Sequence, residues 1–157
     1  MGKVGLSIGR KNERSCGTCT KCCEGWLVAD IKGITMEPGK PCHLVEIGKG
    51  CSDYKNRPET PCKTFSCMWK AEKALPEQFS PEKTGVIITV QSVAGIDYLA
   101  AVYAGQEIQT DFLSWFVAYC VSGKLNFEWV VNGQAIYIGS DEFTAAMNNK
   151  YGIVLKK

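Results

Sequence analysis

Apolar and polar positions follow regular patterns only in the second half of the chain. Residues 86–90 (VIITV) and 98–103 (YLAAVY) are runs of β-branched and aromatic residues on either side of Ala94-Gly95. Two such runs joined by turn residues are typical of a β-hairpin. Residues 127–131 and 134–138 form a second pair, separated by Asn132-Gly133. Because Asn-Gly favours the tight turn with two positive φ angles, a second hairpin is predicted there.

Helical spacing appears between and after these pairs. Aromatic residues recur at intervals of three and four within residues 111–122, where Thr110 or Asp111 can cap the start and Gly123 the end; they are Phe112, Trp115, Phe116 and Tyr119. This spacing predicts a helix that buries one aromatic stripe. Ser140-Asp141-Glu142 predicts the start of a short helix over residues 143–150 that stops at Gly152. Residues 65–75 are a weaker helix prediction ended by Pro76, and Ser80-Pro81 predicts a further capped turn.

The first half has no comparable pattern. Beyond residues 24–31 there is no sustained period, and prolines interrupt the chain at positions 38, 41, 58 and 61. Such a segment cannot order itself by apolar burial, as expected where metal bonds replace a core. The predicted fold class is therefore α+β. A loop-rich, metal-stabilised module (residues 1–78) packs on a small antiparallel sheet with one or two helices (residues 79–157), in one compact unit.

The first half instead concentrates the cysteines. Eight of nine lie there, and only Cys120 lies outside; the eight are Cys16, Cys19, Cys22, Cys23, Cys42, Cys51, Cys62 and Cys67. In a Cys-x-x-Cys turn the intervening amides can fold back onto the sulfurs, so that two thiolates reach one ion. Zinc takes four such ligands in tetrahedral geometry. The eight cysteines are therefore candidate metal ligands, with disulfides as a less favoured alternative.

The number and order of the cysteines leave the arrangement open. Adjacent side chains point apart in an extended chain, so Cys22 and Cys23 are expected to serve two ions or opposite sides of one cluster. Eight ligands satisfy two all-thiolate tetrahedral sites, or one four-cysteine cluster with four further thiols. Two divalent ions on eight thiolates leave a net charge of about −4. The basic excess of residues 1–78, with 13 Lys/Arg against 9 Asp/Glu, would balance it.

These motifs resemble a known bacterial family. The run Cys16-Gly-Thr-Cys19-Thr-Lys-Cys22-Cys23, followed by Pro41-Cys42-His43, Gly50-Cys51-Ser52, Arg57-Pro58, Pro61-Cys62 and Cys67, is similar to the CxxCxxCC cysteine-cluster family. That family is described as a zinc- or iron-chelating domain. The resemblance covers residues 16–67 and implies the eight cysteines as ligands, with Arg57-Pro58 as part of the framework. Lys63 and Ser66 depart from its usual arginine and proline.

The identity of the metal is not decided by the ligands, because thiolates suit zinc and iron–sulfur clusters alike. The compact cysteine run has ferredoxin-like spacing, but Glu24 follows Cys23 where a ferredoxin usually has proline. Zinc, as two or more ions, is the favoured cofactor. The predicted function is zinc chelation in a mainly structural or partner-binding protein. The alternatives are an iron–sulfur protein with a redox or enzymatic role, and metal storage or delivery; whether the chain is an enzyme stays open.

The composition of the chain limits its expected cellular location and partners. No apolar run approaches the roughly 20 residues of a membrane span, and residues 1–14 lack the apolar core of a secretory signal. We therefore expect a cytoplasmic protein with no membrane partner. The net charge of +2 gives no reason to expect nucleic-acid binding. The remaining partner class is another protein, which the half from residue 79 would contact.

Other residues have simpler interpretations. His43, the only histidine, could ligate beside Cys42 but is expected to point away from the ion, and Asp30 and Asp53 are expected to be surface acids. Cys120 is expected to be a small buried residue. Trp26 and Trp69 are expected to shield the cysteine segment from water. The weak basic arm made by Lys3, Arg10, Lys11 and Arg14 is expected to be solvated, with phosphate contact as the alternative.

Overall fold

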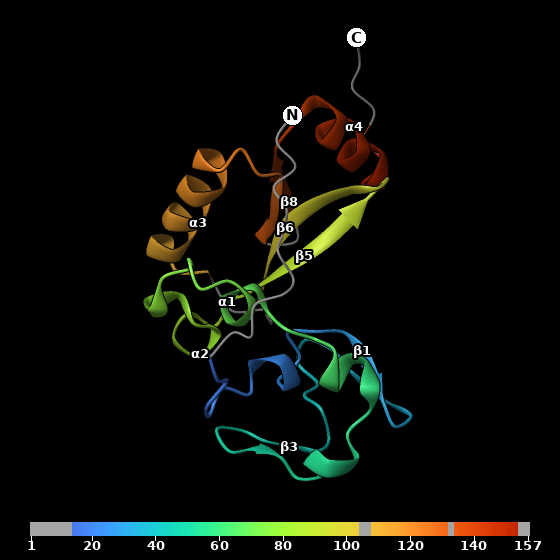
Figure 1. Ribbon diagram of the computed structural model, residues 1–157. Helices are drawn as coiled ribbons and strands as arrows, with labels where there is room; N and C mark the ends of the chain where they lie inside the picture. The colour runs from blue at the N-terminus through green and yellow to red at the C-terminus, as the bar shows by residue number, and fades with distance from the viewer. Residues whose placement is uncertain (1–13, 104–107, 132–133, 154–157) are drawn as a thin grey trace.

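The computed structural model describes residues 14–103, 108–131 and 134–153, and the chain forms a cysteine-rich lobe below a sheet-containing lobe (Figure 1). The elements of the first lobe are short, with coil between them. They are η1 (Lys21–Cys23), β1 (Ala29–Ile31), β2 (Ile34–Met36), β3 (Val45–Glu46), β4 (Gly50–Cys51), η2 (Tyr54–Asn56) and η3 (Glu59–Lys63). Two small antiparallel pairs, β1 with β2 and β3 with β4, are the sheet structure of this lobe. The loop-rich character predicted for it is confirmed.

The second lobe holds the longer elements. They are α1 (Met68–Ala71), η4 (Glu77–Phe79), α2 (Pro81–Thr84), β5 (Ile87–Val93), β6 (Ile96–Val102), α3 (Thr110–Ser122), β7 (Phe127–Val131), β8 (Gln134–Ile138) and α4 (Asp141–Lys150). The α+β class is confirmed. The predicted helix over residues 65–75 is reduced to α1, because Cys67 and Glu72 at its two ends adopt extended backbone angles.

The four long strands form one sheet in the order β5-β6-β7-β8. The outer pairs are antiparallel, as predicted for two hairpins, but β6 and β7 run parallel, with Leu99 opposite Phe127. The expectation of an antiparallel sheet is therefore wrong at its centre. The reason is that α3 lies between β6 and β7 in the sequence, and a helical crossover returns the chain in the same direction.

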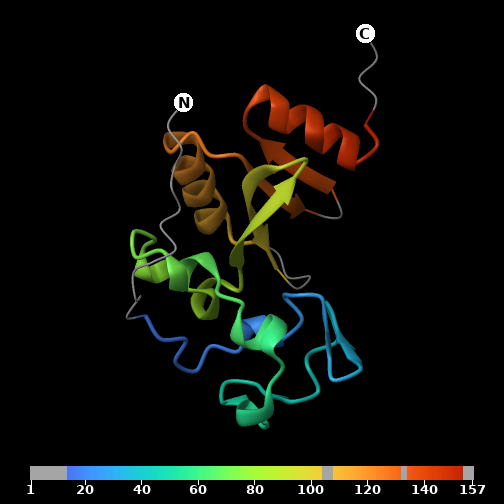
Figure 2. The same cartoon turned by 45° about the vertical axis from the view of Figure 1, so that its right-hand side comes forward.

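The sheet is covered on both faces. Phe112, Phe116 and Cys120 of α3 are fully buried against a core that includes Phe127, so the aromatic stripe and the buried Cys120 are confirmed. On the other face Phe143 and Met147 of α4 pack in a second cluster. The two helices are seen on either side of the strands in Figure 2.

One predicted turn and one predicted cap are present, whereas α3 begins after Gln109 without the side-chain cap expected from Thr110 or Asp111. Ala94 and Gly95 both have positive φ, 49° and 77°, as the tight turn between β5 and β6 requires. Ser140 accepts a hydrogen bond from the Phe143 backbone N–H at 3.2 Å and caps α4. Asn132-Gly133 lies outside the described residues, although the strands that flank it are present as predicted.

A buried acid lies between α4 and the sheet. The Glu128 side chain is buried and accepts a hydrogen bond from the Tyr151 hydroxyl, while Lys150 Nζ lies 3.5 Å from its Oε2. Lys150 Nζ also donates to the Tyr98 hydroxyl at 2.9 Å. Burial alone would lower the pKa of Lys150, but the contacts with Tyr98 and Glu128 raise it above its ordinary value.

The two lobes share one hydrophobic core. Trp26 of the cysteine-rich lobe packs in the same cluster as Met68, Trp69 and Leu75, and its indole N–H donates to the Gly85 carbonyl. Helix α1 packs against β5. The cysteine-rich lobe therefore rests on the sheet-containing lobe, while the boundary near residue 78 stays a prediction.

Candidate metal centre

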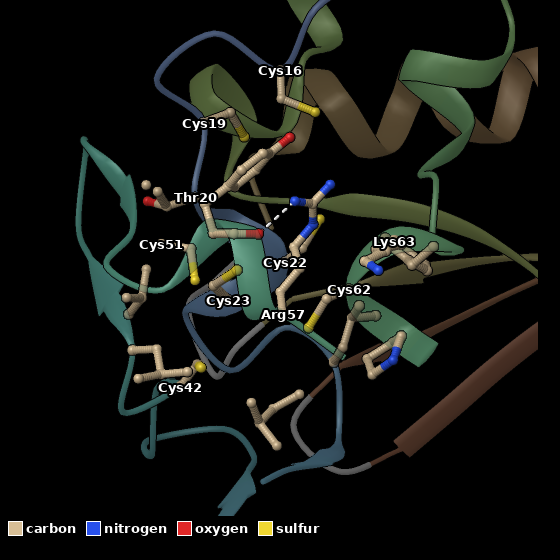
Figure 3. A pocket seen from close by; sticks show the side chains of 18 of the residues that line it. Cys16, Cys19, Thr20, Cys22, Cys23, Cys42, Cys51, Arg57, Cys62 and Lys63 are labelled. Carbon is tan, nitrogen blue, oxygen red and sulfur yellow. Dashed lines mark hydrogen bonds between the residues drawn. The ribbon is translucent and has the colours of Figure 1, made fainter. Parts of the chain in front are cut away.

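Seven of the eight N-terminal cysteines line one cavity of about 610 Å³; they are Cys16, Cys19, Cys22, Cys23, Cys42, Cys51 and Cys62 (Figure 3). The eighth, Cys67, is buried at 6% exposure and belongs to the hydrophobic core against which Cys22 packs. Cys120 is a buried residue of α3 and does not line this cavity. The fold thus gathers the cysteines that the sequence singled out and separates the ninth.

The first cysteine run is folded into consecutive turns. The Cys19 N–H donates to the Cys16 carbonyl at 2.9 Å, and the Cys23 N–H donates to the Thr20 carbonyl at 2.8 Å. Gly17 has a φ of +55°, a conformation that glycine adopts at little cost. Two tight turns therefore present four thiols within one short segment.

Nearby backbone amides partly offset the effect of burial on two thiols. The Lys21 N–H acts in this way on Cys19. The N–H groups of Trp69 and Lys70, in the first turn of α1, act on Cys67, and the Lys70 N–H donates to the Cys67 carbonyl at 3.1 Å. Burial is the stronger effect, so the pKa of both Cys19 and Cys67 is raised.

The remaining ligand candidates come from loops further along the chain. The Cys42 N–H donates to the Cys23 carbonyl at 2.8 Å, which fixes this loop to the first run. Cys51 lies in β4, paired with Val45 of β3. Cys62 lies in the single wide turn η3. Three segments that are distant in sequence thus meet the first cysteine run.

The wall of the cavity is basic. Four cationic side chains line it, Lys49, Arg57, Lys63 and Lys70, and none of the described residues that line it is a carboxylate. Arg57 donates to the Tyr54 carbonyl at 2.7 Å and stacks on the Tyr54 ring, 3.6 Å from the ring centroid. The sequence drew attention to Arg57 only through its resemblance to a family, and gave no signal for the lysines.

Sulfur charges would repel one another in this cavity. Burial and, to a smaller extent, the charges of neighbouring cysteines raise the pKa of Cys22 and of Cys23, the latter to about 11. All nine cysteines are free thiols, and no three His, Cys, Asp or Glu side chains in the described part of the chain converge closely enough to hold an ion. The sulfurs surround a space, and in donor type they fit a soft cation.

Three other candidate ligands do not line the cavity. His43 is exposed. Asp30 accepts a hydrogen bond from the Gly33 N–H at 2.8 Å, and Asp53 forms an ion pair with Lys32 at 2.5 Å. These contacts agree with the expectation that Asp30 and Asp53 are surface acids. Trp26 and Trp69 lie in the core that backs onto Cys22 and Cys67.

Arg14 differs from the expectation of a solvated basic arm. Its guanidinium donates to the carbonyls of Trp69 and Leu75, both at 2.6 Å, so this side chain ties the segment before Cys16 to α1. No local pattern indicates this role, because the acceptors are backbone atoms more than 50 residues away. Lys3, Arg10 and Lys11 lie outside the described residues.

Comparisons with family models, curated proteins and solved structures find no match for this chain. Within the described part of the chain, none of the helices has the length and apolar character needed to cross a membrane.

Proposed function

We propose that this protein binds metal through its eight clustered cysteines, with zinc as the favoured ion, and that the metal has a mainly structural role. One observation carries the proposal: cysteines from four separate segments surround one cavity, and within the described part of the chain no carboxylate lines it. Soft thiolates without oxygen ligands favour zinc or iron–sulfur clusters over calcium or magnesium. The resemblance of residues 16–67 to the CxxCxxCC cysteine-cluster family supports the same function.

The charges of the cavity support two filled sites. Two divalent ions held by eight thiolates carry a net charge of about −4. Four cationic side chains line the same cavity. Lys49 and Lys63 also approach exposed glutamates, at 3.5 and 3.1 Å, so their charges are partly shared. Arg57 and Lys70 form no ion pair with a carboxylate among the described contacts, so their positive charges remain available to balance the thiolates.

A structural role follows from how little apolar material the cysteine-rich lobe buries. Before Cys67 its buried hydrophobic side chains are Trp26, Ile31 and Met36. Structural zinc contributes roughly 10–16 kcal/mol of folding free energy in finger peptides. We place the protein in the cytoplasm, where clustered thiols are kept reduced as metal ligands. The sheet-containing lobe would offer a partner surface, with Ile136 and Ile138 exposed on the edge strand β8.

The test is elemental analysis with metal-edge spectroscopy on the full chain purified without oxygen. We expect about two zinc ions per chain and a first shell of four sulfurs around each. A protein that contains no metal and keeps the same far-UV spectrum and melting temperature with a chelator would overturn the proposal. More than two readily exchanging ions would instead indicate storage or delivery.

The shared cavity is compatible with one alternative, an iron–sulfur protein with a redox role. Seven cysteines from four segments line one space, and iron–sulfur clusters are held by cysteine thiolates. Stoichiometric iron and sulfide in a brown anaerobic preparation would establish this alternative, and a colourless zinc protein would exclude it.

A further inference from the structure

The cysteine cavity has two distinct ends. In Figure 3, Cys16 and Cys19 lie at one end, and Cys23, Cys42, Cys51 and Cys62 lie toward the other. A division of the ligands between these ends would let the adjacent residues Cys22 and Cys23 bind two different ions.

Arg14 holds the first end against α1. Its guanidinium donates to the Trp69 carbonyl at 2.6 Å and lies over the Trp69 ring, 4.7 Å from the centroid. Arg14 precedes Cys16 by two residues, and Trp69 follows Cys67 by two. This contact therefore brings Cys16 close to Cys67 despite their separation in sequence.

Cys22 faces the same end. It packs against the hydrophobic core that includes Cys67. Figure 3 places Cys16 and Cys19 at this end of the cavity. The packing and these positions group Cys22 with Cys16, Cys19 and Cys67.

Cys23 faces the other end. Its carbonyl accepts the Cys42 N–H at 2.8 Å, and the Val45 N–H donates to the Cys42 carbonyl at 3.1 Å. Val45 pairs with Cys51, so the short β3–β4 ladder holds Cys42 and Cys51 on adjoining segments. Figure 3 shows Cys42, Cys51 and Cys62 around Cys23 at this end of the cavity.

We propose that the eight cysteines form two separate four-thiolate metal sites, Cys16/Cys19/Cys22/Cys67 and Cys23/Cys42/Cys51/Cys62. The assignment rests on the proposed metal binding and extends it to the individual ligands. The peptide bond between Cys22 and Cys23 links the two sites. The first site fastens the cysteine-rich lobe to α1, and the second holds its loops to one another.

Paired substitutions test the assignment in the full-length protein. Cys16→Ser with Cys67→Ser removes two ligands from one site and leaves the other complete. Cys16→Ser with Cys62→Ser removes one ligand from each. After a chelator challenge that leaves two ions on the wild type, we expect the first variant to keep one ion and the second to keep none. Cys120→Ala is the control and should keep both.

The same prediction can be checked in the wild type, which covers the case of a variant that fails to fold. Zinc is withdrawn stepwise by a chelator, and the exposed thiols are alkylated in short pulses and located by mass spectrometry. Loss of the first ion should expose one complete set of four thiols while the other set stays protected. Fragmentation between Cys22 and Cys23 shows which of the two has reacted.

The outcomes separate the two proposals. Alkylation that labels all eight cysteines together, or labels a set that mixes the two groups, would overturn the assignment while leaving metal binding intact. The same holds if the Cys16/Cys67 and Cys16/Cys62 variants, both folded, retain equal amounts of metal. A wild type that binds no zinc under anaerobic conditions would overturn the proposed function itself.

Discussion

Replacing Arg14 with methionine removes a guanidinium that joins the start of the cysteine run to α1, while it keeps a long apolar stem. The guanidinium donates to four backbone carbonyls: Trp69 at 2.6 Å, Glu72 at 3.1 Å, Lys73 at 3.3 Å and Leu75 at 2.6 Å. Trp69 lies within α1, and the other three carbonyls follow its C-terminal end, where a helix leaves acceptors without an intrahelical donor. The substitution would leave them without this donor.

The magnitude follows from the two shortest bonds. Hydrogen bonds to charged groups contribute about 1.5–3 kcal/mol each. The Arg14 side chain is 17% exposed, so water can replace part of what is lost, and its 3.5 Å contact with the exposed Glu77 adds little. We therefore expect the free energy of unfolding to fall by about 3 kcal/mol. Alkylation of Cys16 should also be faster in the variant than in the wild type, whereas the alkylation rate of Cys62 should change less.

The assay is urea unfolding of the metal-loaded protein followed by tryptophan fluorescence, with pulse alkylation of Cys16 as the second measurement. Arg14→Lys is the matched control, because it keeps the charge but not the planar fork, and it should recover only part of the stability. Glu77→Gln should change the free energy of unfolding by less than about 0.5 kcal/mol. A loss below about 1 kcal/mol for Arg14→Met would refute the structural role of this residue.

Three further predictions concern other parts of the fold. Gly25→Ala should destabilise the protein by at least about 2 kcal/mol, because Gly25 has a φ of +94° and a Cβ there would lie 2.5 Å from the Glu37 carbonyl oxygen. Phe116→Ala should cost about 3–5 kcal/mol in urea unfolding, since Phe116 is fully buried, without changing the metal content. The raised pKa of Lys150 means that its stabilising contribution is complete below its ordinary value of 10.5 and is lost as the pH rises further. The melting temperature of the wild type should therefore fall as the pH rises above 10.5, and that of Lys150→Met should fall less.

Each of these has its own control. Gly17 also has a positive φ, but its Cβ would meet nothing within 4 Å, so Gly17→Ala should cost less than Gly25→Ala; equal losses would contradict the predicted clash. A Phe116→Ala variant that loses less than about 1.5 kcal/mol would show that the α3 stripe is loosely packed. If the melting temperatures of Lys150→Met and the wild type fall equally at alkaline pH, Lys150 is not the cause of that loss of stability.

Much of the sheet-containing lobe could be predicted from the sequence, because its signals are local. Ala94-Gly95 specifies a tight turn, Ser140 caps the helix that follows it, and the aromatic spacing of residues 111–122 defines α3. Each signal depends on residues within about two helical turns of one another. The α+β class and the buried position of Cys120 followed from these signals.

The sequence also determined which residues to consider as ligands. Eight cysteines in the first 67 residues are outside ordinary usage, and thiolate chemistry limits what they could hold. The adjacency of Cys22 and Cys23 raised the question of two metal centres, but nothing local could allocate the other six.

Only the tertiary structure decided how the local pieces combine. The parallel pairing of β6 with β7 depends on α3 crossing one face of the sheet. The contacts of Arg14 with α1 bridge more than 50 residues, and the proposed grouping of Cys67 with Cys16 depends on the same bridge. Periodicity and turn residues specify the local structure of a segment. Contacts between distant segments are set by the packing of whole elements, which is why the sequence singled out the cysteines and the proposed division between two sites rests on the fold.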